Sequence, residues 1–433
     1  MIRRDALREY SRGSLWLLPV VAVMVSVALG AVLSRIDVGP TSLLAFQGTA
    51  DDARNLLIGI TSTMVTVIAL LLGLAVVALQ LSSTQFSPRL LRNFLRDRPN
   101  QLVLSSFVAT FGYAAAGLYT VGVSAGQRTS DFPRLAVTGA IVLLFVSLGL
   151  LVYFADHLAH SIQVDSIMRV ARIQTLAVID DAVLGGGQEF VPAPHQAVPI
   201  AARRSGYLQA VNVADLLAWA SRSRACLRLH LRVGEHVVAG TTVAWLWPAS
   251  ADGPWPDRTT AAAVLDRDIR IGLERTFEQD AAFGIRQLVD MACKAMSPAV
   301  NDPYTAVQAV NSISVIFNRL ATRPLGDYVA QDGAGATVVV PGRRFGDYLA
   351  TMCGLIRRYG AREPTVAQAM LRLLANCSAA VGDDPDRQSA IGTQARLVVA
   401  EADRYVAEPA DLAIVYAEAA PLLGAPTDGG SGG

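Results

Sequence analysis

The chain has 433 residues, a net charge of +1 at pH 7 and a hydrophobic fraction of 52%. A nearly neutral chain has no general attraction for nucleic acid, so no nucleic acid is expected as a partner. The hydrophobic fraction is higher than that of an ordinary soluble protein and lower than that of a chain embedded along its whole length. A membrane part and a soluble part are therefore expected.

Four apolar segments fill the first third of the chain: residues 14–33, 56–81, 102–123 and 135–155. Each has about 20 or more residues without Asp, Glu, Lys or Arg, the length that an α-helix needs to cross a bilayer core. They predict a four-helix transmembrane domain over residues 1–155, with the lipid bilayer as a partner. A signal peptide is the alternative for the first segment, but its apolar stretch is longer than a typical signal core.

The distribution of arginines predicts the orientation of the chain in the membrane. Four precede the first segment, and the loop after the second segment carries four more, Arg89, Arg92, Arg96 and Arg98. The first and third loops carry only two each. Because cytoplasmic loops are enriched in Lys and Arg, both termini are expected on the cytoplasmic side of a bacterial inner (plasma) membrane.

The second segment carries a stripe of small and polar residues at spacings of three and four. Its members are Ser62, Thr66, Ala69, Gly73, Val77, Gln80 and Thr84. One interpretation is a packing face, because small residues let helices approach closely. The other is the lining of a water-filled pore built from several copies, with Ser62, Thr66, Gly73, Gln80 and Thr84 as pore-lining candidates.

Residues 87–96 follow the second segment and predict a short helix in the membrane interface. Ser87 and Pro88 favour a helix start, and Arg89, Arg92 and Arg96 would reach the lipid headgroups. The alternative is a collar of arginines that concentrates anions at a cytoplasmic vestibule.

No Asp, Glu, Lys, Arg or His lies near the middle of any apolar segment. Such groups mark proton relays, ion-coupled carriers and voltage sensors. The membrane part is therefore expected to be a passive channel or an anchor, and not a coupled transporter.

The soluble part divides into four predicted regions. Residues 156–187 have a helical pattern and form a connector, whereas residues 188–250 alternate with period two, most clearly from Cys226 to Val233. The hairpin pattern there resembles half of a biotinyl/lipoyl-like barrel-sandwich, which implies a small β-barrel. Since those domains carry their cofactor on a lysine and none occurs in 188–250, a structural role is expected. Residues 257–423 predict a helical domain and residues 424–433 a flexible tail.

Two polar motifs stand out in the helical domain, ERTFEQDAAFGIRQLVD (274–290) and SPAVNDPYTA (297–306). The second contains Asp302 before Pro303, which predicts a helix N-cap and a first-turn proline. The candidate residues of a polar network or ligand pocket are Arg275, Asp280, Arg286, Asp290, Asn301 and Asp302. Three interpretations stay open: a salt-bridged network between helices, a pocket for a small ligand or anion, and an acid–base active site.

Recognised catalytic and nucleotide-binding motifs are missing from the sequence. The single lysine, Lys294, has no phosphate-loop context, and neither a His-Glu-x-x-His nor a Gly-x-Ser-x-Gly motif occurs. An enzyme is therefore the least favoured interpretation, and no cofactor or metal is expected.

Together with QLSSTQFSPRLLRNF (80–94), the two polar motifs resemble an uncharacterised family of bacterial predicted integral-membrane proteins. The resemblance covers nearly the whole chain. It implies four N-terminal spans and a cytoplasmic C-terminal region, and it implies no activity.

The predicted fold is an α-helical membrane protein, with four transmembrane helices followed by a cytoplasmic α+β region. Our leading hypothesis is a homo-oligomeric channel that conducts ions or small solutes passively, with a cytoplasmic vestibule or gate. The rival is a membrane-anchored scaffold or sensor whose cytoplasmic domain binds a ligand or a protein partner. The rival predicts that the stripe of the second segment packs against its own bundle.

Overall fold

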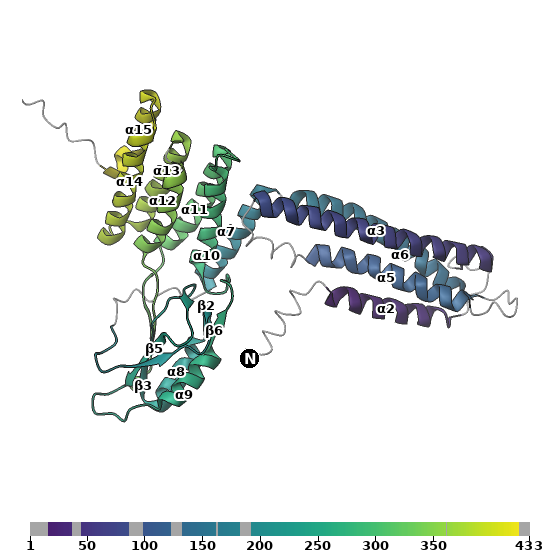
Figure 1. Ribbon diagram of the computed structural model, residues 1–433, viewed down its shortest axis with the longest axis horizontal. Coiled ribbons are helices and arrows are strands. Elements are labelled where there is room, and N and C mark those ends of the chain that lie inside the picture. The colour runs from purple at the N-terminus through teal and green to yellow at the C-terminus, as the bar shows by residue number, and fades with distance from the viewer. Residues whose placement is uncertain are drawn as a thin grey trace, which may run out of the picture. The chain divides into compact units, whose positions relative to one another are not determined.

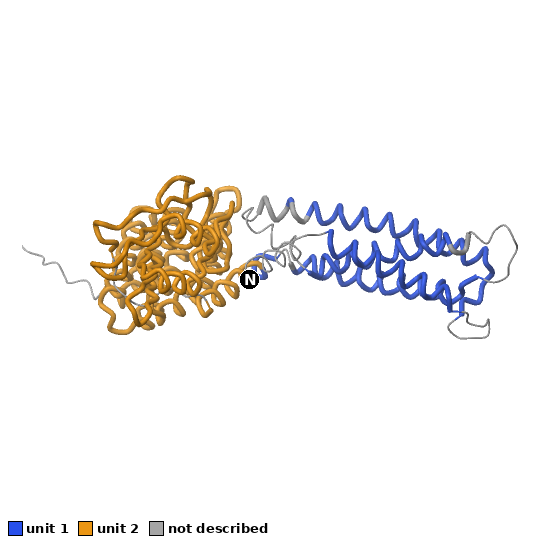
Figure 2. The backbone as a smooth tube through the Cα atoms, turned by 90° about the horizontal axis from the view of Figure 1, so that it is seen from below, with its two compact units in different colours: residues 1–166 blue, residues 167–433 orange. Residues whose placement is uncertain are grey.

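A computed structural model describes residues 16–36, 45–85, 98–122, 132–161, 163–181, 192–360 and 362–423, without the side chains at 78, 79, 81–85, 120–122 and 161. The chain forms two compact units, residues 1–166 and 167–433, which are coloured separately in Figure 2.

Four helices form the first unit. They are α2 (Leu17–Leu33), α3 (Ala50–Gln85), α5 (Arg98–Gly122) and α6 (Arg134–Ser161). Helix α5 packs against each of the other three (Figure 1). The contacts are apolar with a few internal hydrogen bonds, such as the one that the buried Tyr113 hydroxyl donates to the Ala136 carbonyl at 2.9 Å.

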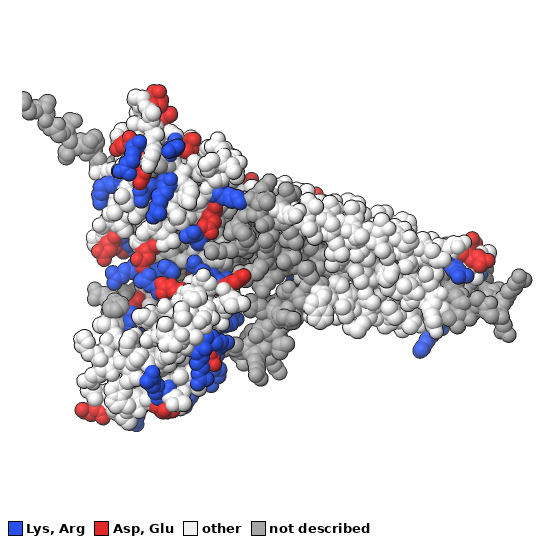
Figure 3. Space-filling view, in the orientation of Figure 1, with Lys and Arg blue, Asp and Glu red and all other residues white. Residues whose placement is uncertain are grey.

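Three of these helices are long and apolar enough to cross a membrane, over Ala50–Val77, Arg98–Tyr119 and Arg134–His160. On the face shown in Figure 3, their middle carries no charged side chain. Helix α2 is apolar but has 17 residues, the lower limit of the spanning range, and it is not one of the three candidate spans. The membrane part is thus confirmed with three candidate spans, and the predicted count of four is not confirmed. The interfacial helix predicted at 87–96, with Arg89, Arg92 and Arg96, lies outside the described residues.

The second unit begins within α7 (Val164–Asp181) and continues with a mixed α/β region. The strands are β1 (Val198–Ala201), β2 (Gly206–Val211), β3 (Ala225–Leu229), β4 (His236–Val237), β5 (Thr242–Pro248), β6 (Ile269–Gly272), β7 (Tyr328–Gln331) and β8 (Thr337–Val340). Helix α8 (Val213–Ser223) follows β2, and helix α9 (Arg258–Asp268) precedes β6.

The described strands form two sheets. One has five strands in the order β1-β5-β3-β8-β7, and the other has three in the order β4-β2-β6. All pairs are antiparallel except β3 with β8, where Leu227 lies opposite Val338.

The predicted small β-barrel is therefore not confirmed, because the described strands form no closed barrel. The period-two pattern at 226–233 correctly indicates a strand, but such a pattern does not identify the strand's partners. One partner of β3 is β8, whose sequence TVVV is strand-like but lies in the range predicted as a helical domain. Strands β6 and β7 also come from that range.

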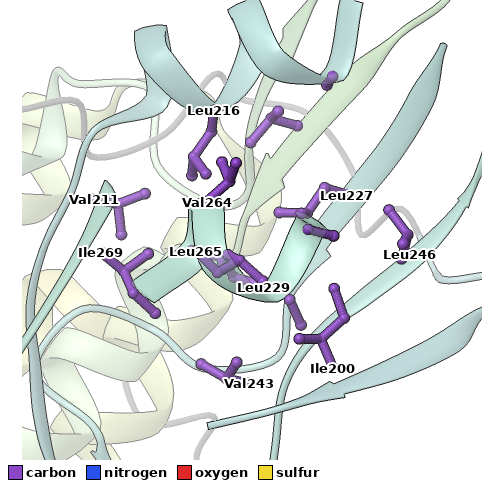
Figure 4. Packing of buried hydrophobic residues seen from close by; sticks show 14 of the residues in the cluster. Ile200, Val211, Leu216, Leu227, Leu229, Val243, Leu246, Val264, Leu265 and Ile269 are labelled. Atoms are coloured by element: carbon purple, nitrogen blue, oxygen red, sulfur yellow. The ribbon is translucent and has the colours of Figure 1, made fainter. Parts of the chain in front are cut away.

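Apolar side chains from both sheets and both helices make one core. They include Leu216 of α8, Leu265 of α9 and Leu227, Leu229 and Leu246 of the larger sheet, all at most 2% exposed. Figure 4 shows these side chains pointing toward one another from their separate elements. Burial of this kind contributes about 1.5–3 kcal/mol per large aliphatic side chain.

Six helices complete the second unit: α10 (Ala281–Ala295), α11 (Pro303–Ala321), α12 (Phe345–Gly360), α13 (Pro364–Val381), α14 (Pro385–Tyr405) and α15 (Pro409–Leu423). An acidic side chain caps the N-terminus of four of them, namely Asp280, Asp302, Glu363 and Asp384. The prediction that Asp302 caps a helix with Pro303 in its first turn is confirmed.

Candidate functional site

The polar stripe on α3 faces away from the other described helices of its own unit. Ser62, Thr66, Gly73 and Gln80 are all exposed. The buried side of α3 consists of larger residues, including Leu57, Ile60, Met64 and Leu71. The stripe is therefore not the surface with which α3 packs on α5 and α6.

Little side-chain bulk projects from this face of α3. The Thr66 hydroxyl turns inward and donates to the Ser62 carbonyl at 3.2 Å. A Cβ placed on Gly73 or on Gly59 would meet no heavy atom within 4 Å. Thr84 ends the stripe within α3, and its side chain lies outside the described residues.

The second candidate site is an ion pair at the start of α10. Arg275 donates from Nε to Asp280 Oδ2 at 2.8 Å and from Nη2 to Oδ1 at 3.0 Å. The side chains are 19% and 3% exposed, respectively. The Asp280 carboxylate also accepts from the Phe283 amide at 3.1 Å, so it caps α10 while it binds Arg275.

Two opposing effects act on this carboxyl group. Burial raises the pKa of Asp280, because the charged form loses its hydration, whereas the charge and hydrogen bonds of Arg275 oppose that rise. The net direction is upward, and the ion pair is held away from water.

A small cavity adjoins this ion pair, within the second unit. Its volume is about 40 Å³, and its wall includes Asp280, Arg232 from the loop after β3, Arg343 from the loop after β8, and Tyr348 of α12. In Figure 3, charged side chains gather along the boundary between the strands and the helices of this unit. The cavity thus brings together side chains from segments far apart in the sequence.

The chain matches a family model described as "Predicted membrane protein (DUF2254)" over residues 12–376. The protein belongs to this family of predicted membrane proteins. It is similar to a protein named "Uncharacterized protein MT1328" from Mycobacterium tuberculosis (strain CDC 1551 / Oshkosh) and to "Uncharacterized protein Mb1321c" from Mycobacterium bovis (strain ATCC BAA-935 / AF2122/97). Each alignment is 43% identical and covers 96% of this chain and 82% of the relative. No solved structure matches the chain significantly.

In this DUF2254 protein, the six residues expected to form a polar network lie in three separate places. Arg275 and Asp280 pair at the N-terminus of α10. Arg286 donates to Asp290 at 2.6 Å, one turn apart along the same helix. Asn301 and Asp302 follow the C-terminal end of α10, where the Asp302 amide donates to the Ala295 carbonyl at 2.8 Å.

Each of these three places has its own local role. Asn301 is exposed and adopts a left-handed backbone conformation with φ of 48°. Asp302 accepts from the amide of Thr305 at 3.1 Å, and the side-chain hydrogen bond of Thr305 is the largest cause that lowers the pKa of Asp302. Among the described residues of this set, therefore, only Asp280 lines the cavity, and Arg275 is connected to it through the ion pair.

Sequence reasoning missed Arg232, Arg343, Tyr328 and Tyr348, which line the same cavity. None belongs to the two polar motifs, and each comes from a different loop or element. One local signal in the sequence is Gly234, which directly follows the alternating residues 226–233; its φ is 88°. A Cβ at that position would collide with Asp280 Oδ2, so the absence of a side chain at 234 makes room for the ion pair.

Proposed function

We propose that this DUF2254 protein forms a homo-oligomer in which the α3 helices of several copies face one another, and that the assembly conducts ions or small solutes passively. In this proposal α2 crosses the bacterial inner membrane as a fourth span, so that both termini lie in the cytoplasm, as the arginine distribution favours. The proposal assigns no catalytic reaction, cofactor or metal to the chain.

The observation that carries the proposal is the exposure of the α3 stripe in a single copy. Lipid chains pack well against large apolar side chains, whereas Gly, Ser and Thr are enriched where transmembrane helices contact each other. Spacings of three and four along the stripe, from Ser62 to Gly73, suit left-handed packing at a crossing angle of about 20°. A second copy of this chain is therefore the partner that best fits this face.

The polar groups of the stripe are also compatible with a water-filled path along the axis of such an assembly. Hydroxyl groups at Ser62 and Thr66 and an amide at Gln80 lie on one side of the helix. Uncharged polar groups around an axis can replace part of an ion's hydration without trapping it. The apolar stretches contain no charged residue near their middle, which supports passive conduction over ion-coupled transport.

The second candidate function is a membrane-anchored sensor, which the cavity beside Asp280 favours. The two functions differ in the expected assembly. A ring of four or more copies supports a channel, whereas a monomer removes the shared axis on which conduction depends.

The test uses the full-length protein purified in detergent and reconstituted in liposomes. We expect native mass spectrometry to give a closed oligomer, and we expect ion flux above that of protein-free liposomes. Thr66→Phe should reduce the flux, whereas Val142→Phe on the exposed side of α6 should leave it unchanged. A stable oligomer without flux, or equal flux in both variants, would overturn the proposal.

A further inference from the structure

Several polar groups that line the cavity in the second unit have few hydrogen-bond partners among the described residues. Its volume of about 40 Å³ has room for roughly three water molecules or one small ion, and not for a nucleotide. Its wall includes Arg232, Asp280, Ala281, Tyr328, Arg343 and Tyr348.

Tyr348 contributes a hydroxyl group to the cavity wall. The residue is only 4% exposed, and no hydrogen bond joins its hydroxyl to another described residue. Burial raises the pKa of this hydroxyl, so it remains a hydrogen-bond donor at neutral pH. Water or a ligand in the cavity can accept this hydrogen bond.

Two guanidinium groups that are only weakly paired with carboxylates line the same cavity. Arg343 is 20% exposed, and its ion pair with Glu235 is long, at 3.9 Å. Its guanidinium makes no hydrogen bond to the rest of the described chain. Arg232 lies 3.3 Å from Asp347, and both of these side chains are more than a third exposed.

The acidic groups do not favour a cation. The oxygens of Asp280 already accept from Arg275 and from the Phe283 amide. Glu235 and Asp347 are 36% and 41% exposed, and each accepts from a backbone amide, that of Arg232 and that of Arg344, respectively. An anion would therefore displace only their solvent-screened contacts with the two guanidinium groups.

We propose that this cavity binds a small phosphoryl oxyanion, either inorganic phosphate or the phosphate of a small monoester. Arg343 and Arg232 would bind its oxygens, and the Tyr348 hydroxyl would donate a further hydrogen bond. Arginine is suited to this task because its planar donors match the spacing of phosphate oxygens. The carboxylates of Glu235 and Asp347 compete for the same guanidinium groups, so binding should be modest and should weaken as salt increases.

Isothermal titration calorimetry of the full-length protein in detergent, at constant ionic strength, tests the inference. The ligands are inorganic phosphate and glycerol 3-phosphate, with chloride as the reference anion. We expect saturable binding of phosphate. Tighter binding of glycerol 3-phosphate would identify a monoester as the ligand, and weaker binding would identify the free ion.

Three variants decide whether binding occurs in this cavity. Arg343→Gln should weaken phosphate binding by about tenfold or more, since it removes charge-assisted hydrogen bonds. Tyr348→Phe, which keeps the ring, should weaken it about threefold or more. Arg344→Gln removes the same charge from the exposed neighbouring residue and should change binding less than twofold.

Melting temperatures without ligand verify that each variant is folded. The inference is overturned if the unmodified protein binds no phosphate saturably, if Arg344→Gln weakens binding as much as Arg343→Gln, or if folded Tyr348→Phe binds as tightly as the unmodified protein. Because these titrations are made in detergent and measure no flux, their outcome is independent of the proposed conduction.

Discussion

Arg275 and Asp280 are five residues apart and are joined by two hydrogen bonds, of 2.8 and 3.0 Å, at the start of α10. The backbone of Gly234 lies against this pair, in space that any side chain would fill. The Gly234 backbone thus covers the ion pair, which keeps both charged groups buried and oriented toward each other.

Asp280→Asn should destabilise the second unit strongly. The amide retains a capping oxygen but leaves the buried Arg275 charge without its counterion, and breaking such a pair costs about 3–5 kcal/mol. The measurement is the thermal midpoint of the full-length protein in detergent. Asp266→Asn, which breaks the exposed pair with Arg204, should cost about 1 kcal/mol or less. Equal shifts in the two variants would contradict a special role for the buried pair.

Gly284→Ala should weaken the contact between α7 and α10. A Cβ at position 284 would overlap the Thr175 hydroxyl oxygen, and Thr175 is fully buried. Overpacking of this kind costs about 1–3 kcal/mol. Thr175→Ala in the same chain should restore part of the lost stability, as a double-mutant cycle would measure.

The matched control for that variant is Gly354→Ala on α12, where an added Cβ meets nothing within 4 Å. It should be neutral or slightly stabilising, because alanine is the better helix former. A loss of stability at 354 similar to that at 284 would show that the effect is not specific to the α7–α10 contact.

Gly73→Leu should leave a single copy folded and weaken self-association by about tenfold or more, because a large side chain would separate facing α3 helices. Within one copy, position 73 has nothing within 4 Å of an added Cβ. Gly149→Leu on α6 is the control, since that glycine is equally exposed and open. Native mass spectra that match for the two variants would argue against association through α3.

Asp180→Asn should lower stability near neutral pH and have little effect in acid. Asp180 accepts from Arg319 Nε at 2.7 Å and from Arg323, which ties α7 to α11. The hydrogen bond with Arg323 is the largest cause that lowers the pKa of Asp180 from 3.8. A lowered pKa means that the contribution is present above about pH 3.8 and is lost as the pH falls through the folded-state pKa.

Thermal midpoints of the unmodified protein and the Asp180→Asn variant, compared from pH 6 downward, check this prediction. The difference should shrink below pH 3.8. Asp181→Asn at the exposed neighbouring position should show no such trend. A difference between the unmodified protein and Asp180→Asn that stays constant across this range would contradict the assignment.

Local patterns in the sequence predicted much of the fold. Apolar length identified α3, α5 and α6, an Asp-Pro pair identified the start of α11, and alternation identified β3. The arrangement of the sheets was not predicted, because the pairing of β3 with β8 joins segments that are far apart in the chain. Nothing within residues 337–340 specifies which strand lies beside them.

The candidate site was predictable to the same limited extent. The motif at 274–290 indicated charged pairs, and Arg275 pairs with Asp280 within it. Arg343 and Tyr348 reach the same cavity from other elements, and their sequence neighbours resemble those of ordinary surface loops and amphipathic helices. Only the tertiary fold brings them close to Asp280.

The parallel pairing of β3 with β8 constrains how the protein is made. When the ribosome has completed residue 250, β3 still lacks one of its two neighbouring strands, and one edge of its backbone remains unpaired until residues 337–340 emerge. Such long-range closure slows folding and exposes a strand edge in the meantime. A nascent chain or a truncated protein that ends near residue 257 should therefore be prone to aggregation and sensitive to proteases. Soluble fragments should be designed to extend beyond Val340.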